Sequence, residues 1–316
     1  MDKLIDAIEQ AQNPSIVGLD PTEALVPAPV LAAYTEEATN AVDDESQAPA
    51  AALAMAYFQF NCAIIDAVAD IVPAVKPQIA MYEAIGPAGV DAYTMTCEYA
   101  QQQGLYVLGD IKRGDIGSTA AAYAKHFGDD CLGDAWHENG ITVNPYLGSD
   151  GITPFVEAAA ASDGDVFALV RTSNPSSAQI QELELADGAK LYEHVADLVS
   201  QWGADHIGRH GYSLLGAVVG ATHPQQGSEL RARMPHTFFL VPGYGAQGGT
   251  AATVRGMFDA DGMGAIVNSS RGIIGAWRDD PSYSDDVNAS TALDIVARCA
   301  RQAAMDMRDD LRAMLP

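Results

Sequence analysis

The chain has 316 residues, of which 48% are hydrophobic, and a formal net charge of −25, so it can bury a large core. So acidic a surface repels nucleic acid and anionic membranes, and neither is an expected partner. No continuous apolar run reaches the ~18 residues of a membrane span, and the N-terminus lacks the basic-then-apolar order of a signal peptide. The four cysteines form no CxxC pair or zinc-ligand spacing, which is typical of a reducing compartment, so we expect a cytoplasmic protein.

Acidic residues are scattered along the chain, with 29 Asp against 13 Glu. This pattern leaves two interpretations open. The protein is either an ordinary acidic protein or one adapted to a cytoplasm rich in salt, where screening suppresses self-repulsion. We favour salt adaptation. The chain has only five lysines beside 12 arginines, so each lysine is more informative than usual.

Short apolar runs bounded by Gly, Pro, Asn or Asp recur along the chain and predict strands of a parallel sheet that is buried on both faces. These runs span residues 15–20, 74–80, 105–112, 140–146, 165–173, 213–221, 237–245 and 264–272. Ala-rich amphipathic segments predict helices over residues 51–70, 88–103, 118–127, 149–161, 178–203, 224–233, 249–259 and 289–313.

Eight strands, each followed by a helix, predict an α/β fold with a single (β/α)8 TIM barrel domain over residues 1–316. Two connections are long, after the first and fifth strands, and they predict excursions from the barrel at about residues 21–50 and 174–212. A doubly wound sheet is the competing architecture. The regular units, with charged or Gly-rich strand ends, favour a closed barrel.

The stretch GDIKRGDIG ends the third predicted strand with four charged side chains, of which the two aspartates and the lysine could form part of an active site. Alternate residues of a strand point to the same side, so Asp110 and Lys112 should form an ion pair at the rim of the barrel. Asp115 lies beyond the strand end. The competing interpretation is structural, with Asp115 or Ser118 capping the helix that follows.

Lys76 lies on the neighbouring predicted strand and changes this balance. Two of the five lysines then stand on adjacent strand ends, facing the aspartates of GDIKRGDIG. Active sites of such barrels form at the C-terminal ends of the strands. A catalytic cluster is therefore the better interpretation.

Two Gly-rich or polar loops follow the last two predicted strands. PGYGAQGG (242–249) lets backbone N–H groups approach an anion, and NSSRG (268–272) supplies Arg271. Loops at these two places are the usual phosphate site of this fold. We therefore expect a phosphorylated small substrate. The seven histidines show no HExxH or paired ligand spacing, so we interpret them as surface or capping groups and predict no metal site.

Six segments together resemble the orotidine 5'-phosphate decarboxylase family. In chain order they are VGLDP, the strand of Lys76, DIKRGDIGST, RTSNP, PGYGAQGG and NSSRG. The resemblance spans about residues 15–275, and RTSNP together with the long connections is most similar to the longer, type 2 branch. It implies a (β/α)8 barrel that decarboxylates orotidine 5'-phosphate to UMP without metal or cofactor.

The resemblance also implies roles for individual residues. Lys76, Asp110, Lys112 and Asp115 match the charged catalytic array of the family, with Lys112 as the proton donor. Asp115, with Ile116 and Thr119, would reach into the active site of a second subunit, which implies a homodimer. The remaining matches are substrate-binding positions: Asp20 for the ribose (with Lys76), Ser173 for the pyrimidine, and Gln247, Ser270 and Arg271 at the phosphate loops.

Two other functions are open to a barrel of this kind. One is a magnesium-dependent sugar-phosphate decarboxylase or aldolase, which needs an acidic metal ligand at the end of the second strand. This chain has Lys76 there, which would repel the metal. The other is a non-catalytic barrel that binds nucleotides. Binding alone does not require a cluster of closely packed charges, which costs free energy to bury.

Overall fold

The computed structural model describes residues 1–41, 46–128, 131, 133–245 and 248–315. Within these ranges, eight parallel strands pair in chain order, and the last pairs with the first to close a barrel. The strands are Ser15–Leu19 (β1), Ala74–Pro77 (β2), Tyr106–Arg113 (β3), Gly140–Val143 (β4), Asp165–Arg171 (β5), Leu215–Val219 (β6), Phe239–Pro242 (β7) and Ala265–Ser269 (β8). The predicted (β/α)8 barrel is confirmed.

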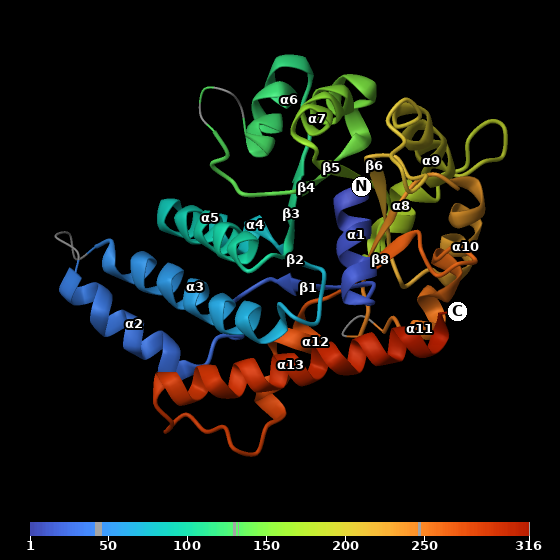
Figure 1. Ribbon diagram of the computed structural model, residues 1–316. Coiled ribbons are helices and arrows are strands. Elements are labelled where there is room, and N and C mark those ends of the chain that lie inside the picture. The colour runs from blue at the N-terminus through green and yellow to red at the C-terminus, as the bar shows by residue number, and fades with distance from the viewer. Residues whose placement is uncertain (42–45, 129–130, 132, 246–247, 316) are drawn as a thin grey trace.

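Helices surround the barrel (Figure 1). The α-helices are Asp2–Ala11 (α1), Ala28–Ala41 (α2), Ala48–Val68 (α3), Ile79–Glu83 (α4), Pro87–Gln102 (α5), Gly117–Tyr123 (α6), Ser149–Ser162 (α7), Ala178–Gln181 (α8), Leu191–Trp202 (α9), Pro224–Arg233 (α10), Ala251–Val254 (α11), Arg271–Ile274 (α12) and Ala289–Met314 (α13). Five 3₁₀ turns each precede or follow one of these helices within the described ranges: Ala124–Phe127 (η1), Pro145–Leu147 (η2), Pro175–Ser177 (η3), Arg255–Met257 (η4) and Ala276–Asp279 (η5).

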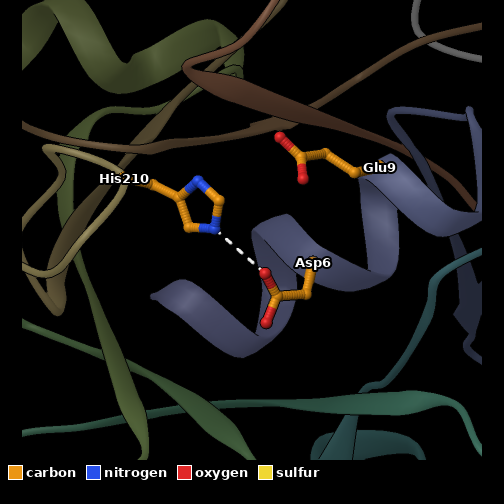
Figure 2. Close-up of side chains that lie close together, drawn as sticks. All are labelled: Asp6, Glu9 and His210. Atoms are coloured by element: carbon orange, nitrogen blue, oxygen red, sulfur yellow. Dashed lines mark hydrogen bonds and ion pairs between the residues drawn. The ribbon is translucent and has the colours of Figure 1, made fainter.

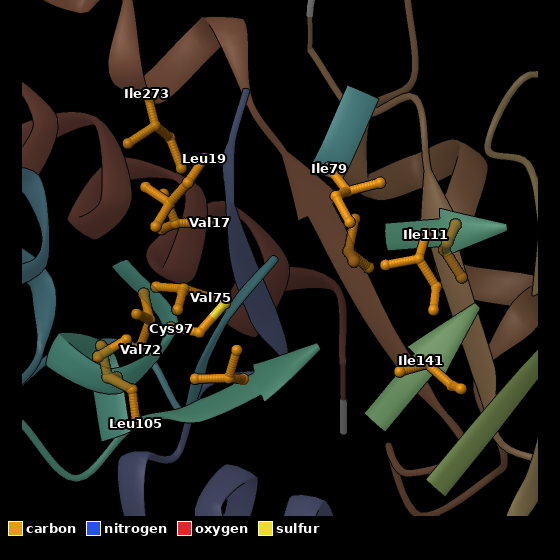
Figure 3. Close-up of a cluster of buried hydrophobic side chains, with 14 of the residues drawn as sticks. Val17, Leu19, Val72, Val75, Ile79, Cys97, Leu105, Ile111, Ile141 and Ile273 are labelled. Atoms are coloured by element: carbon orange, nitrogen blue, oxygen red, sulfur yellow. The ribbon is translucent and has the colours of Figure 1, made fainter. Parts of the chain in front are cut away.

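The core lies between the strands and this layer of helices. Every residue of β1, β2, β4, β6 and β8 is buried, as the continuous apolar runs predict. In Figure 3, Val17 and Leu19 of β1 lie near Ile273 of α12, and Val75 of β2 lies near Cys97 of α5. Each such aliphatic side chain contributes about 1.5–3 kcal/mol when buried, so the strand positions are firmly held.

Helix α1 closes the N-terminal end of the barrel. Its apolar face (Leu4, Ile5 and Ile8) is buried in a second cluster that includes Ile16 of β1 and Leu108 of β3. Because α1 covers this end, the C-terminal ends of the strands are the side from which a substrate can enter.

The predicted helix over residues 178–203 is wrong in one respect, because it is two helices, α8 and α9. Between them the chain turns at Gly188, whose φ is +86°, and the N–H of Leu185 donates to the carbonyl of Ala189 (2.8 Å). Glycine adopts this left-handed backbone readily. The Asp187–Gly188 pair is a turn signal that outweighs the helical pattern around it.

The long connection after β1 contains helix α2, which the sequence did not predict. It packs against α3 and α13 (Figure 1). By length and composition alone α3 could cross a membrane, but half of its most apolar window is buried inside the fold. It packs against α2, α5 and α13, as the core helix of a folded domain does.

Candidate active site

A cavity of about 640 Å³ opens at the C-terminal ends of the strands. Its wall carries many of the predicted site residues: Asp20, Lys76, Asp110, Lys112, Ser173, Ser270 and Arg271. They lie on or directly after β1, β2, β3, β5 and β8. Small-molecule sites commonly measure about 300–1,000 Å³. The predicted site residues at the strand ends therefore do come together, and the cavity between them is large enough for a nucleotide.

Asp110 lies between two lysines on this wall. Lys76 Nζ is 2.9 Å from Asp110 Oδ2 and 3.6 Å from Asp20 Oδ1. Lys112 Nζ is 2.5 Å from Asp110 Oδ1, which confirms the predicted ion pair. Lys76 is only 3% exposed, whereas the side chain of Lys112 is 45% exposed. One ammonium is thus locked in the wall and the other faces the cavity.

Two neutral side chains complete the surroundings of Asp110. Gln78 Nε2 donates to Asp110 Oδ2 and Thr142 Oγ1 donates to Asp110 Oδ1, both at 2.9 Å. Sequence reasoning missed both residues. The available signal was their position, since Gln78 comes two residues after Lys76 and Thr142 lies on the next strand after β3, at the same end of the barrel.

The charges of this cluster shift one another's protonation. Burial alone would raise the pKa of Asp110, but the ammonium groups of Lys76 and Lys112 outweigh it and hold the pKa well below its ordinary value. Burial alone would lower the pKa of Lys76, but Asp110 and Asp20 outweigh it and raise that pKa. Both groups are therefore charged at neutral pH.

The backbone of Lys112 is left-handed, with φ +46°. The pairing of β3 with β4 also shifts register between Gly109 and Arg113, as in a β-bulge. A residue with a Cβ loses roughly 1–2 kcal/mol in this conformation. Thr142 supports it, because its Oγ1 accepts from the Lys112 N–H (3.0 Å) while donating to Asp110. Strained residues held in this way concentrate at functional sites.

The opposite wall of the cavity comes from the last two strands. Gly243 and Tyr244 follow β7, and Ser270 and Arg271 follow β8. Asn268 Nδ2 donates to Ser270 Oγ (3.3 Å). Arg271 brings a cation to this wall, as the predicted phosphate site requires.

A sequence model of the orotidine 5'-phosphate decarboxylase / HUMPS family matches residues 15–283. The chain belongs to this family. Curated orotidine 5'-phosphate decarboxylases are similar over nearly their whole length. That of Rhodopirellula baltica is 44% identical (90% of this chain, 94% of the relative), and that of Clostridium acetobutylicum is 39% identical (100% and 99%).

Solved structures of the family superpose on nearly the whole chain. The Leishmania donovani OMP decarboxylase is 28% identical, with a TM-score of 0.72 over 99% of this chain and 97% of that one. A putative orotidine 5'-phosphate decarboxylase from Streptomyces avermitilis is 29% identical, with a TM-score of 0.75 over 99% and 95%.

The structure does not place Asp115 and Thr119, predicted site residues of this family, in the cavity of their own chain. Asp115 is half-buried beyond β3, and its Oδ1 accepts from the Ile116 N–H (2.7 Å). Thr119 is exposed on α6. That helix begins at Gly117 and its N-cap, Ile116, makes no side-chain cap, so the structure does not support the capping interpretation. Gln247, another predicted site residue, lies outside the described residues.

His126 corrects the interpretation of the histidines as surface or capping groups. It is 4% exposed, its Nδ1 lies 2.7 Å from Glu138 Oε2, and its ring stacks on Trp136. The Tyr93 hydroxyl donates to the other oxygen of Glu138. This cluster lies behind β3, since a Cβ at Gly109 would collide with Glu138.

Within the described ranges, one group of His, Asp or Glu side chains lies close enough together to hold a metal ion: Asp6, Glu9 and His210. Figure 2 shows His210 pointing at Asp6, with Nε2 2.9 Å from Oδ1. Arg209 pairs with the other oxygen of Asp6. Asp6 and Glu9 lie on α1, at the closed end of the barrel, and His210 lies in the connection between α9 and β6. The Asp6 carboxylate already has two partners, His210 and Arg209.

Thr142→Val should lower turnover about tenfold, whereas Thr142→Ser should stay near the wild type. Valine has the same shape but removes two hydrogen bonds, each worth about 0.5–1.5 kcal/mol, that hold Asp110 and the strained Lys112 in place. Steady-state kcat of the two purified variants is the measurement. Equal losses in both would show that the hydroxyl is not what matters.

Proposed function

We propose that this chain converts orotidine 5'-phosphate to UMP and CO₂ without a cofactor. The observation that carries the proposal is the Lys76–Asp110–Lys112 array on the wall of a nucleotide-sized cavity. Its support from comparison is the 39–44% identity to curated enzymes of this name over nearly the full chain.

The chemistry follows from the charges. The bond between C6 and the carboxyl carbon breaks, its electron pair stays on C6, and CO₂ leaves. That pair lies in the ring plane, out of conjugation, so a nearby cation must stabilise it. Lys112 supplies the cation and then donates its proton to C6, after which water reprotonates the amine.

Asp110 acts on the departing group. Two unit charges 4 Å apart interact by about 4 kcal/mol at an effective dielectric constant near 20. Held beside the substrate carboxylate by its four donors, Asp110 disfavours the bound substrate by an energy of this order, and the repulsion is relieved as CO₂ forms. Phosphate binding at Arg271, far from C6, supplies the energy that keeps the substrate there.

Incubation of the purified chain with orotidine 5'-phosphate and a chelator tests this function. UMP is expected to form with the chelator present, because Lys112 is the electrophile. If the chain is salt-adapted, as we propose from its charge of −25, UMP should form faster in multimolar KCl than in dilute buffer. Absence of UMP at every salt concentration would overturn the proposal.

The same assay separates the rival functions. A magnesium-dependent sugar-phosphate enzyme would be silent with chelator and would act on a sugar phosphate instead. The Lys76 ammonium, 2.9 Å from Asp110, stands where such an enzyme needs an acidic ligand. A nucleotide-binding barrel without activity would bind UMP but form none.

We further propose a cytoplasmic homodimer of the type 2 branch, in which Asp115 and Thr119 complete the cavity of the partner subunit. Both lie outside the cavity of their own chain. Large apolar side chains are exposed in the connection after β3, which holds Asp115, and in the turn after β4: Ile116 (60%), Tyr146 (83%) and Leu147 (45%). Exposed apolar side chains gathered in this way favour an interface.

Mixing two inactive variants tests the shared site. Lys112→Ala and Asp115→Ala subunits, mixed in equal amounts, should regain activity, because each hybrid dimer has one cavity with neither change. Random pairing makes half the dimers hybrid, so about a quarter of the cavities are intact. The matched control is Lys112→Ala with Asp110→Asn, which lie in the same cavity and should show no rescue. If the Asp115 mixture stays equally inactive, Asp115 acts in its own chain.

A further inference from the structure

Arg171, the last residue of β5, has a fully buried side chain. Its guanidinium donates to residues of two connections: Nε to Gln226 (2.6 Å), Nη1 to Ser177 (2.6 Å) and Gln181 (3.0 Å), and Nη2 to Glu182 (2.5 Å). A buried guanidinium is stable only when its N–H groups have such partners. Arg171 therefore ties the segment after β5 to α10 without itself reaching the cavity.

Gln181, at the end of α8, is the partner of Arg171 that does line the cavity. Its Oε1 accepts from Arg171 Nη1 and from the Thr172 N–H, both at 3.0 Å. Its Nε2 donates to Thr172 Oγ1 (2.7 Å). A guanidinium and a backbone N–H can only donate, so they fix which end of the amide is the oxygen.

This network gives Gln181 a defined polarity. Both lone pairs of Oε1 are engaged, and Nε2 carries two N–H bonds, of which Thr172 accepts one. The second remains for a ligand. Gln181 therefore offers a hydrogen-bond donor, and no acceptor, to a molecule in the cavity beside Ser173.

The barrel indicates which part of the substrate meets this donor. In the closed order of eight strands, β5 lies opposite β1. A ribose held at Asp20, after β1, points the far side of its base toward β5. In a pyrimidine ribosylated at N1, the atom opposite N1 is C4, whereas C6 is adjacent to N1 and is free to face Lys112.

Resting on the function proposed above, we propose that Gln181 is a specificity-determining residue that donates its second amide N–H to the C4 oxygen of the pyrimidine. Arg171 is the positioning residue that holds the amide in this orientation. The C4 oxygen of a uracil nucleotide accepts this hydrogen bond. The C4 amino group of a cytosine nucleotide is itself a donor and would be placed against the donating N–H of Gln181. The site thus selects oxo- over amino-pyrimidines.

The test compares UMP with CMP, which share ribose and phosphate. Dissociation constants of both are measured by calorimetry for the wild type, Gln181→Glu and Gln181→Met, and orotidine 5'-phosphate turnover is measured for the wild type. The wild type should bind UMP at least about 10-fold more tightly than CMP. Both variants should reduce this ratio by about tenfold, with Gln181→Glu the stronger because its carboxylate can accept from the amino group.

The ratio of the CMP and UMP dissociation constants reports recognition of the base alone, because the two nucleotides share the same ribose and phosphate. A glutamate that merely repels the phosphate would weaken the binding of UMP and of CMP equally. The ratio of their dissociation constants would then stay unchanged, which would overturn the inference. Gln302→Glu, which adds the same charge on α13, should keep the wild-type ratio. Gln181→Glu retains acceptors for Arg171 and Thr172, so its melting temperature should stay close to that of the wild type.

Arg171→Lys tests the positioning role. Lysine keeps the charge but cannot reach several partners at once, so the UMP-to-CMP ratio should fall although residue 171 does not line the cavity. An unchanged ratio in a folded Arg171→Lys protein would refute that role. A wild type that forms no UMP would overturn the proposed function, whereas an active wild type with unaltered ratios in both Gln181 variants would overturn only this inference.

Discussion

Replacing Lys112 by alanine should lower turnover of orotidine 5'-phosphate by at least about 10⁴-fold while leaving the affinity for UMP within about tenfold of the wild type. Stabilisation of a developing charge is worth about 10²–10³ in rate, and proton transfer about 10²–10⁴. In the mechanism that we propose, the side chain of Lys112 supplies both. Single-turnover rates and UMP calorimetry on the same preparation are the measurements.

The fold should tolerate this change. Lys112 is 45% exposed, and Asp110 keeps Lys76, Gln78 and Thr142 as donors. Lys3→Ala is a matched control, because Lys3 also pairs with a carboxylate, Asp163 (2.9 Å), but at the closed end of the barrel. It should retain full activity. Should UMP affinity fall in Lys112→Ala as far as turnover does, the lysine would be a structural or binding residue.

The barrel could be predicted because its strands are buried on both faces. Their apolar runs have no period to confuse with a surface helix, and each ends where polar residues begin. The break between α8 and α9 was harder to see. Ala- and Leu-rich residues on both sides continue the helical pattern, and the turn depends on one glycine, Gly188, at positive φ.

The charged part of the site could be predicted because so few lysines are present. Lys76 and Lys112 stand out in a chain with 42 acidic residues. Gln78 and Thr142 could not be found in the same way, since neutral side chains of these types are common at strand ends. Their role depends on where β2 and β4 place them around Asp110, which is a property of the closed barrel.

Two further features depend on contacts that a sequence pattern does not express. The left-handed backbone of Lys112 is unusual for lysine and lies where the pairing of β3 with β4 shifts register. In the sequence, nothing distinguishes Arg171 from any other charged residue at the end of an apolar run. Its importance comes from Gln181 and Gln226, which are 10 and 55 residues away along the chain.

Asp110→Asn should have the second large effect, and on two quantities at once. Removal of a charge worth about 4 kcal/mol at the departing carboxylate lowers turnover by about 10³-fold. The amide also places an NH₂ group against one pair of the donors that surround Asp110 in the wild type. Those donors lose their acceptor, and the arrangement of the neighbouring side chains is expected to change as well. Asparagine has the same shape, so the loss reports charge and hydrogen bonding rather than packing.

The free energy of unfolding should fall by about 3 kcal/mol at pH 7, because Lys76 loses its nearest counter-charge while buried. Asp20, at 3.6 Å, remains and limits the loss. Asp70→Asn is a suitable control, since Asp70 pairs with Arg301 at 2.5 Å but is 65% exposed. Exposed pairs contribute about 0–1 kcal/mol, so that variant should unfold almost like the wild type in urea titrations at fixed salt.

The pH dependence of this loss identifies Lys76 as its source. In the wild type the pKa of Lys76 is raised, so the stability that it contributes is complete below the unfolded pKa, near 10.4, and is lost as the pH rises through the folded pKa. In Asp110→Asn we expect burial to outweigh Asp20 and to lower the pKa of Lys76, so that the folded variant releases the proton first and gains stability as the pH rises. The gap between the two proteins should therefore narrow from pH 7 to pH 10. A gap that stays constant over this range would mean that the lost stability comes from the hydrogen bonds of Gln78 and Thr142 instead of the buried ammonium.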